Sequence, residues 1–168
     1  MDDAPPLQAL AGWREIADTM ISVPHPYTLA YACQWIATAA DELRERRAVH
    51  FAIQPKSEPQ LIGAIALRAI EAEHSQAELS FWIGVPWWGR GFATEAVRVV
   101  TDFGFTQLGL NRLYAHHMAR NPNSGRVLEK VGFKPEGLLR QRVRKWDVFE
   151  DVVLMAMVRA DWAVHSQA

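Results

Sequence analysis

Two closely spaced glycines stand between a strand-like apolar run and a helical pattern, in the segment Trp87-Trp88-Gly89-Arg90-Gly91-Phe92-Ala93-Thr94. Glycines at this spacing let the backbone turn sharply and direct successive N–H groups towards one point. A helix that begins directly afterwards adds unpaired N–H groups and the positive end of its dipole. The segment therefore predicts a binding site for a pyrophosphate. A tight turn that binds nothing is the alternative that glycine spacing alone leaves open.

Two nucleotide-binding motifs fail at this segment. A P-loop ends in Gly-Lys-Ser/Thr, and these residues are absent here. A dinucleotide fingerprint has a third glycine, where this chain has Thr94, and an acidic residue about 20 positions further on. The chain has Leu110, Asn111 and Arg112 near that distance. The pyrophosphate is therefore not expected to belong to a nucleotide bound in either of these ways.

A second segment, Asn121-Pro122-Asn123-Ser124, is followed by Val127-Leu128-Glu129-Lys130-Val131-Gly132-Phe133. Asparagine is a good helix N-cap, proline suits the first helical position, and Gly132 can end the helix. From local chemistry alone, all of these residues could serve only the architecture.

In their order and spacing the two segments are more specific than either one alone. Residues 88–93 resemble the acetyl-CoA-binding motif Gln/Arg-x-x-Gly-x-Gly/Ala of the GCN5-related N-acetyltransferase (GNAT) superfamily, with Trp88 in place of the usual Gln or Arg. The form Trp-Gly-x-Gly-Phe-Ala-Thr-Glu-Ala resembles the branch of RimJ/RimL-type ribosomal-protein N-terminal acetyltransferases. Residues 121–133 resemble the superfamily stretch Asn-x-x-Ser-x-x-x-Leu-Glu-Lys-x-Gly-Phe.

The resemblance implies an α+β fold: one domain over residues 1–168, with a mixed, mostly antiparallel sheet and helices on both faces. Two central strands, 77–85 and 113–119, would splay apart to admit acetyl-CoA, the co-substrate. By the same resemblance Asn121 would bind the pantetheine arm, and Ser124 would protonate the leaving thiolate. The cofactor-binding residues implied in this way are Ile83, Gly84, Val85, Trp88, Gly89, Arg90, Gly91, Phe92, Ala93, Thr94, Asn121 and Ser124.

Acetyl transfer requires a neutral amine, and the pKa of the acceptor amine sets the free energy needed to deprotonate it. Deprotonating a lysine-like amine of pKa ≈ 10.4 at pH 7 costs roughly 4–5 kcal/mol, whereas a peptide α-amine of pKa ≈ 7.7–8.0 costs about 1 kcal/mol. Glu78 is the leading candidate base, and burial is expected to raise its pKa towards a useful range. A solvated strand carboxylate is the alternative, and His116 or His117 could act instead. A backbone N–H near Ile83 is the expected oxyanion donor.

The expected function is transfer of an acetyl group from acetyl-CoA to a primary amine, with a protein or peptide N-terminal α-amine as the favoured acceptor. One alternative is a small-molecule amine such as a polyamine or an antibiotic. Another is a non-catalytic, CoA-binding regulatory module. An RNA-binding strip formed by Arg140, Arg142, Arg144 and Lys145 ranks last, because alternating charges on a strand are usually a solvated face.

Composition narrows the partners. The 168 residues carry a net charge of -1, which argues against a general nucleic-acid binder. No apolar run approaches the ~20 residues of a membrane span, and no signal-peptide pattern opens the chain. A single cysteine, Cys33, favours a cytoplasmic location. Adjacent residues on a strand point to opposite faces, so His116 and His117 do not predict a metal site. A monomer or homodimer is expected.

The hydrophobic pattern predicts the elements that position these residues. Members of the superfamily usually begin with a strand reading roughly Leu-x-Leu-Arg-Pro, and none precedes Leu7, so this edge strand is expected to be missing. Many members also carry a tyrosine where this chain has Met155, which leaves Ser124 or water as the proton donor. The predicted helices are Leu10–Met20, Leu29–Leu43, Ala93–Phe105 and Pro122–Gly132, and the predicted strands are Val49–Ile53, Leu61–Leu67, Ala77–Val85, Leu113–Ala119, Leu138–Arg144 and Asp151–Arg159.

Overall fold

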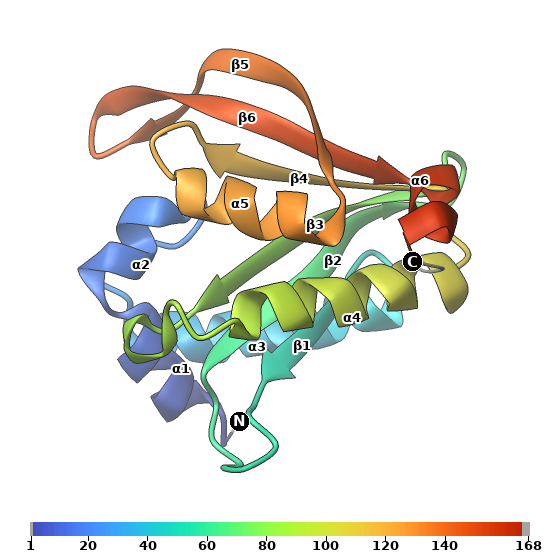
Figure 1. Ribbon diagram of the computed structural model, residues 1–168. Coiled ribbons are helices and arrows are strands. Elements are labelled where there is room, and N and C mark those ends of the chain that lie inside the picture. Colours follow the sequence, from blue (N-terminus) through green and yellow to red (C-terminus); the bar gives the residue numbers. More distant parts are fainter. Residues whose placement is uncertain (1, 166–168) are drawn as a thin grey trace.

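The computed structural model describes residues 2–165, and of residue 165 only the backbone. Its centre is a six-stranded sheet in the order β1-β2-β3-β4-β6-β5 (Figure 1). The β3–β4 pair is parallel and the other neighbours are antiparallel. The predicted mixed, mostly antiparallel sheet is therefore confirmed. The strands are β1 (Val49–Ile53), β2 (Gly63–Glu71), β3 (Gln76–Ile83), β4 (Arg112–Met118), β5 (Lys134–Lys145) and β6 (Val148–Val158).

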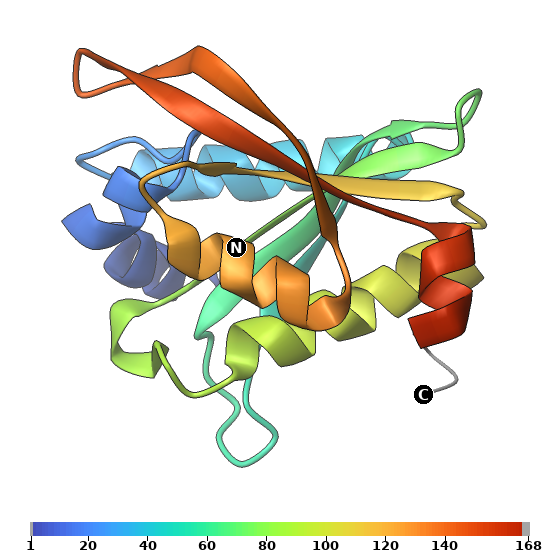
Figure 2. The ribbon, with the colours of Figure 1, turned by 45° about the horizontal axis from the view of Figure 1, so that its top comes forward.

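Helices cover both faces of the sheet, as predicted. Helices α4 and α5 lie on one face, and α3 lies on the other beside the N-terminal helices (Figures 1 and 2). A short 3-10 helix, η1, connects β3 to the loop before α4. The helices are α1 (Ala4–Ala11), α2 (Arg14–Thr19), α3 (Leu29–Arg44), η1 (Val85–Trp87), α4 (Phe92–Thr106), α5 (Pro122–Val131) and α6 (Arg159–His165).

The two central strands separate part-way along their length. Strand β3 pairs with β4 from Gln76 to Glu78, and beyond this point β3 stays with β2 while β4 stays with β6. Gly84 donates its N–H to the carbonyl of Ile62 at 2.7 Å, so Gly84 and the even-numbered residues before it on β3 point their backbone groups at β2. Because these groups alternate along a strand, those of Leu79, Phe81 and Ile83 point into the gap. The predicted splay is confirmed.

Successive side chains of β3 point to opposite faces of the sheet, and on each face they pack into a different apolar cluster. Leu79 and its neighbours on β2 and β4 pack under α4 and α5, where Phe105 and Leu128 are fully buried. A second cluster joins α1 and α3 through Leu7 and Ala32, and Trp82 packs against it. Since Glu78 and Trp82 are four positions apart on β3 and alternate residues share a face, the Glu78 side chain lies on the α3 face of the sheet.

The N-terminal region differs from the single helix predicted over Leu10–Met20. Helix α1 already begins at Ala4, because prolines fit the first helical turn, where no intrahelical N–H is needed. It ends at Gly12, a residue of low helix propensity, and Trp13 is extended at φ −63° and ψ 132°. A second helix, α2, then starts in a new direction. The C-terminal α6 was not predicted, and β5 and β6 begin earlier than expected.

No strand precedes α1 within residues 2–165, and β1 is an edge strand that pairs with β2 alone. Residues 2–165 thus contain no counterpart of the strand that usually precedes the first helix in the superfamily. None of the helices in residues 2–165 is long and apolar enough to cross a membrane.

The predicted arginine strip on β5 is not regular. A register shift lies between Leu139 and Val143, and Gln141 has a φ of 51°, which interrupts the pleat on which the alternation depends. Lys145 is buried rather than solvated, and its Nζ donates to the carbonyls of Met20 at 3.0 Å and Val23 at 2.7 Å. Lys145 therefore holds the segment that follows α2 and is not part of a solvated basic face.

Candidate active site

Glu78 and His116 meet where β3 and β4 begin to separate. The Oε1 atom of Glu78 accepts a hydrogen bond from Nη2 of Arg68 at 2.9 Å and lies 3.2 Å from Nδ1 of His116. Only 16% of the Glu78 side chain is exposed. Arg68 reaches it from β2, where it is paired with Glu78 across the two strands. Three neighbouring strands thus place one cation, one carboxylate and one imidazole in contact.

The pKa of Glu78 does not follow the expectation from sequence. Burial raises the pKa of this carboxyl, but hydrogen bonds and charge from His116 and Arg68 outweigh burial and hold the pKa below its ordinary value of 4.5. The prediction of a raised pKa is therefore wrong, because the sequence did not indicate the two donors. A carboxylate held in this way is a weak base and is well suited to fix the orientation of the imidazole.

A small cavity of ≈ 40 Å³ opens beside this pair. Glu78, His116, His117 and Ser124 all line it, so the structure brings the two predicted catalytic residues to one place. Ser124 comes from the first turn of α5, and its Oγ accepts a hydrogen bond from Nδ2 of Asn121 at 2.9 Å. The Asn121 side chain makes no capping hydrogen bond to α5, in contrast to the capping role that local chemistry predicts.

The two adjacent histidines face opposite sides of β4, as predicted. His116 contacts Glu78, whereas His117 packs against α5, where a Cβ on Gly125 would lie 2.9 Å from its Nε2. Nδ1 of His117 lies 2.9 Å from the carbonyl of Met118. Within residues 2–165 no group of three His, Cys, Asp or Glu side chains could hold a metal ion.

The glycine loop has the backbone conformation that its sequence predicts. Gly89 has a φ of 73° and Gly91 a φ of 86°, in the left-handed region that other residues rarely adopt. A Cβ at either position would have no atom within 4 Å, so these glycines serve the backbone conformation and not close packing. Helix α4 begins at Phe92, and the N–H groups of its first turn have no carbonyl partner within the helix.

Trp88 and Gly84 have structural partners of their own. The Nε1 atom of Trp88 donates to the carbonyl of Ile83 at 2.6 Å and fastens the loop to the end of β3. Gly84 donates its N–H to Ile62 and is not a free donor, unlike the expectation that it pairs with the cofactor. Leu79 and Phe81, which the sequence argument did not include, point their backbone groups into the gap. The alternation of strand hydrogen bonds is the signal that identifies them.

A larger cavity of ≈ 240 Å³ lies between the sheet and α3. It adjoins the small cavity, because Met20, Ser22, Arg68 and Ser80 line both. The sequence argument did not predict this second cavity, since its lining comes from helix and strand residues whose periodicity is typical of a core. Its aromatic lining residues are Tyr27, Tyr31, Trp35, His50 and Trp82.

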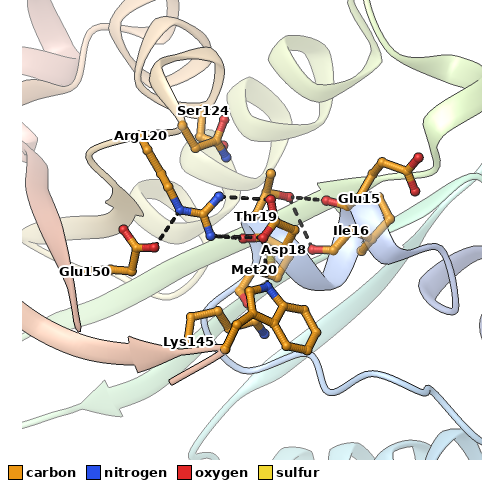
Figure 3. A network of polar contacts seen from close by, with 11 residues as sticks. Glu15, Ile16, Asp18, Thr19, Met20, Arg120, Ser124, Lys145 and Glu150 are labelled. Atoms are coloured by element: carbon orange, nitrogen blue, oxygen red, sulfur yellow. Dashed lines mark hydrogen bonds and ion pairs between the residues drawn. The ribbon is translucent and has the colours of Figure 1, made fainter. Parts of the chain in front are cut away.

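A polar network holds the segment between α2 and α3 over both cavities (Figure 3). Arg120, at the end of β4, donates to both carboxylate oxygens of Asp18 on α2, at 2.9 and 3.1 Å, and to Glu150 of β6 at 2.8 Å. Asp18 also accepts a hydrogen bond from Trp146 at 2.8 Å, and Lys145 binds the carbonyl of Met20. The β5–β6 hairpin and α2 are therefore joined beside the candidate site.

Comparison with known proteins places this geometry in a family. Residues 1–134 match the family model of the acetyltransferase (GNAT) domain. The chain belongs to the GNAT acetyltransferase family. This N-acetyltransferase is 35% identical to the probable N-acetyltransferase YjcK of Bacillus subtilis (strain 168), over 85% of this chain and 80% of YjcK.

Two further relatives have named acceptors. The spermidine N(1)-acetyltransferase of Vibrio cholerae is 29% identical over 66% of this chain and 64% of its own length. The [ribosomal protein uS5]-alanine N-acetyltransferase of Escherichia coli is 25% identical over 71% of this chain and 62% of its own length. The fold matches the crystal structure of spermidine N-acetyltransferase from Vibrio cholerae in complex with CoA and spermine, with a TM-score of 0.84, 23% identity and coverage of 96% and 93% of the two chains.

Proposed function

We propose that this N-acetyltransferase moves the acetyl group of acetyl-CoA to a primary amine, a protein or peptide N-terminal α-amine, by direct attack on the thioester. One observation carries the proposal. A strand edge with free backbone groups and a glycine loop at a helix N-terminus lie on one side of the gap between β3 and β4. The Glu78–His116 pair joins the two strands where they begin to separate, and Ser124 lines the small cavity beside this pair.

The cofactor-binding side of the gap suits a pantetheine arm that ends in a pyrophosphate. The backbone groups of Leu79 and Phe81 and the N–H of Ile83 present a strand edge to the arm's amides, whereas the Ile83 carbonyl is taken by Trp88. The first-turn N–H groups of α4 offer donors to the phosphates. The proposed loop contacts are at Gly89, Arg90 and Gly91 and at the N–H groups of Phe92, Ala93 and Thr94. Bound acetyl-CoA supplies an acyl thioester, the activated carbonyl that an amine attacks.

His116 is the proposed general base, and Glu78 is the proposed positioning residue. Glu78 occupies Nδ1 of His116, so Nε2 is the nitrogen left to take a proton from the acceptor ammonium. The neutral amine then forms the new C–N bond while the C–S bond breaks. The nitrogen loses one further proton as the amide forms, and the thiolate gains one. Ser124 or a water gives its proton to the sulfur and is restored by the proton that leaves the nitrogen, so the products are the acetylated amine and free CoA thiol.

An N-terminal α-amine suits this machinery better than a lysine-like amine. The α-amine costs about 1 kcal/mol to deprotonate at pH 7, against roughly 4–5 kcal/mol for a lysine-like amine. An imidazole held by a carboxylate suffices for the smaller of the two costs. Among the relatives, the uS5-alanine enzyme acts on alanine and the spermidine enzyme acts on a polyamine. A polyamine acceptor is therefore the second candidate.

The test is thiol release from acetyl-CoA with a panel of peptides, polyamines and small amines. We expect turnover with peptides, and we expect His116→Ala, Glu78→Gln and Ser124→Ala to lower kcat by about 10²-fold or more while calorimetric CoA binding is retained. Val99→Ala, an exposed position on α4, is the control variant and should keep the full rate. Firm CoA binding with no turnover on any acceptor would overturn the proposal and favour a CoA-binding regulatory module.

A further inference from the structure

The ≈ 240 Å³ cavity opens from the candidate site towards α3. It reaches the position of Glu78 through the lining residues that the two cavities share, Arg68 and Ser80 on the sheet and Met20 and Ser22 on the loop after α2. An amine placed at His116 would therefore direct whatever its neighbouring carbon carries into this cavity.

The volume restricts the size of that group. An apolar cavity of about 150 Å³ accommodates a benzene molecule, and sites for drug-sized ligands begin at about 300 Å³. A volume of ≈ 240 Å³ lies between the two and fits one amino-acid side chain of the size of leucine, methionine or phenylalanine. A polycyclic group would exceed this volume.

The lining favours an apolar or aromatic group. Tyr31, Trp35 and Trp82 supply ring surface, and Ala64 and Ala66 form a flat floor on β2. Burial, and to a smaller extent the neighbouring Tyr31, raises the pKa of Tyr27 to about 12. The Tyr27 phenol is therefore neutral and adds no negative charge to the cavity. Such a surface gains free energy from burying apolar area and from ring–ring contacts.

The charges of the lining oppose a polycation. In the part of the chain that the structure describes, Glu42 is the only carboxylate that lines this cavity. It is already paired, with Nε2 of His50 at 2.8 Å and with Arg47 at 3.7 Å. The Arg68 guanidinium stands at the junction of the cavities. A second ammonium group entering here would meet a cation before it met any free carboxylate.

Arg68 has a buried donor that lacks a hydrogen-bond partner among the described residues. Its Nη2 donates to Glu78, while its Nε is buried and has no hydrogen-bond partner among the described residues. A buried donor without an acceptor costs about 1–3 kcal/mol, which an oxygen of the ligand would relieve. An α-amino-acyl unit has such an oxygen on its carbonyl carbon, which is bonded to the same Cα as the amine.

We propose that the acceptor is an α-amino-acyl unit with a bulky apolar or aromatic side chain, which fills this cavity while Arg68 Nε binds its carbonyl or carboxylate oxygen. This inference rests on the proposed acetyl transfer and adds the substrate class. The amine lies at His116, the oxygen at Arg68 and the side chain between α3 and the sheet. The oxygen belongs either to a peptide carbonyl or to the carboxylate of a free amino acid.

The experiment compares kcat/KM for tetrapeptides that differ only in their first residue, alanine, leucine or phenylalanine, and adds free phenylalanine, phenylalanine amide and spermidine. We expect leucine and phenylalanine peptides to exceed the alanine peptide by at least about tenfold, since even one methylene in an apolar pocket is worth about 10–200-fold. Free phenylalanine faster than its amide identifies a carboxylate ligand. The amide and the peptide faster than free phenylalanine identify a peptide carbonyl.

Ala66→Leu tests the cavity itself, because the larger side chain fills its floor. The variant should remove the preference for leucine and phenylalanine while the alanine peptide keeps its rate. Ala52→Leu is the matched control, since Ala52 lies on the same face of the sheet on β1, is exposed and does not line the cavity. A preference that survives Ala66→Leu, with CoA binding intact, overturns the inference.

A second variant avoids the buried floor, where overpacking could prevent folding. Tyr31 lines the cavity but is 36% exposed, and Leu29, on the same helix, is 45% exposed and does not line it. Tyr31→Ala should reduce the preference for phenylalanine at least about threefold, whereas Leu29→Ala should not. Equal turnover of all peptides, or spermidine as the best acceptor, contradicts the substrate class but leaves acetyl transfer standing. No turnover with any amine contradicts the proposed function itself.

Discussion

Glu78 is a carboxylate whose surroundings determine what it can do. Burial disfavours its charge, yet His116 and Arg68 supply enough opposing hydrogen bonds and charge to keep its pKa below 4.5. In this state the carboxylate contacts Nδ1 of His116 and leaves Nε2, the other ring nitrogen, without this partner. The proposed roles, Glu78 as positioning residue and His116 as base, rest on the contacts of Glu78 with Arg68 at 2.9 Å and with His116 at 3.2 Å and on the lowered pKa of Glu78.

The lowered pKa predicts how stability depends on acid. A carboxyl whose pKa is lower in the folded than in the unfolded state stabilises the fold above its unfolded pKa. For Glu78 this contribution is complete above about pH 4.5 and is lost as the pH falls through the lower, folded-state pKa. We expect the free energy of unfolding, measured by urea titration between pH 3 and 6, to fall more steeply with acid in the wild type than in Glu78→Gln.

The control for this measurement is Glu129→Gln, which changes an exposed carboxylate on α5 and should leave the steepness unchanged. Parallel curves for the wild type and Glu78→Gln would mean that the carboxyl titrates normally. The contacts with His116 and Arg68 would then not hold the charge in solution.

At the residue scale, the sequence predicted more of the cofactor side of the site than of the acceptor side. Gly89 and Gly91 could be recognised because the glycine segment and residues 121–133 follow each other in the order and spacing of two motifs of one superfamily, although glycine spacing alone also allows a plain turn. Glu78 and Ser124 were singled out, and they do line one cavity. Arg68 and the aromatic residues of the larger cavity were not predicted. Which residues meet across two strands, or between the sheet and a helix, depends on the strand register and the packing, and a single sequence does not reveal these.

At the scale of elements, the loop from Gly84 to Gly91 joins the strand edge to the start of α4. Trp88 ties it to Ile83, and the left-handed glycines direct the chain into the helix. The conformation of the loop thus rests on contacts and dihedral angles within the chain itself. A change in its backbone should alter donor binding more than it alters the fold.

Gly91→Ala tests this loop. Alanine at a φ of 86° is strained, and substitutions of this kind destabilise by roughly 1 kcal/mol or more. For a chain of this size we expect Tm to fall by about 2–4 °C, and KM for acetyl-CoA to rise at least about fivefold, because the strained loop misdirects the first N–H groups of α4. Thermal melts and initial rates at saturating peptide measure the two effects.

Gly137→Ala is the matched control, since this glycine of β5 has no positive φ and its added Cβ would meet no atom within 4 Å. It should change neither Tm nor KM noticeably. Equal KM values for Gly91→Ala and the wild type would show that the loop's left-handed conformation does not matter for binding the donor.

The elements themselves were predictable wherever periodicity was unbroken. Helix α3, α4 and strand β1 lie close to their predicted ranges, because each has an uninterrupted apolar stripe or alternation. The break between α1 and α2 was missed, because Leu10, Trp13, Ile16 and Ala17 keep helical spacing across it. Helix α6 was missed because its contacts are tertiary: Trp162 packs on Phe105 at 5.3 Å and donates to Asp102 at 2.6 Å.

At the scale of the whole molecule, the acceptor cavity is assembled from parts that lie far apart in the sequence. The sheet supplies its floor and α3 one wall, while the segment after α2 closes it beside the β5–β6 hairpin. Arg120, Lys145 and Trp146 hold that segment through Asp18, Met20 and Val23. The hairpin therefore contacts the segment that closes the larger cavity without lining the cavity itself, and under the proposed function it should influence acceptor binding.

Asp18→Asn tests this connection between the hairpin and the cavity. The Asp18 side chain is 41% exposed, and exposed ion pairs contribute only about 0.2–1 kcal/mol, so we expect little change in Tm. The KM for the acceptor should nevertheless rise about threefold or more, because the loss of charge loosens the segment that lines both cavities. Initial rates with varied peptide at saturating acetyl-CoA measure this effect, and KM for acetyl-CoA should stay constant.

Glu136→Gln is the matched control, because it removes an ion pair of similar exposure that is not connected to the segment after α2. Glu136 is 39% exposed and binds Arg112 through both carboxylate oxygens, at 2.7 and 2.5 Å, so it matches Asp18 in exposure and in the kind of partner. It joins β4 to β5 and lines neither cavity. If the network acts through the segment after α2, only Asp18→Asn raises the acceptor KM. If both variants raise it equally, the effect comes from overall stability, and the hairpin has no specific part in acceptor binding.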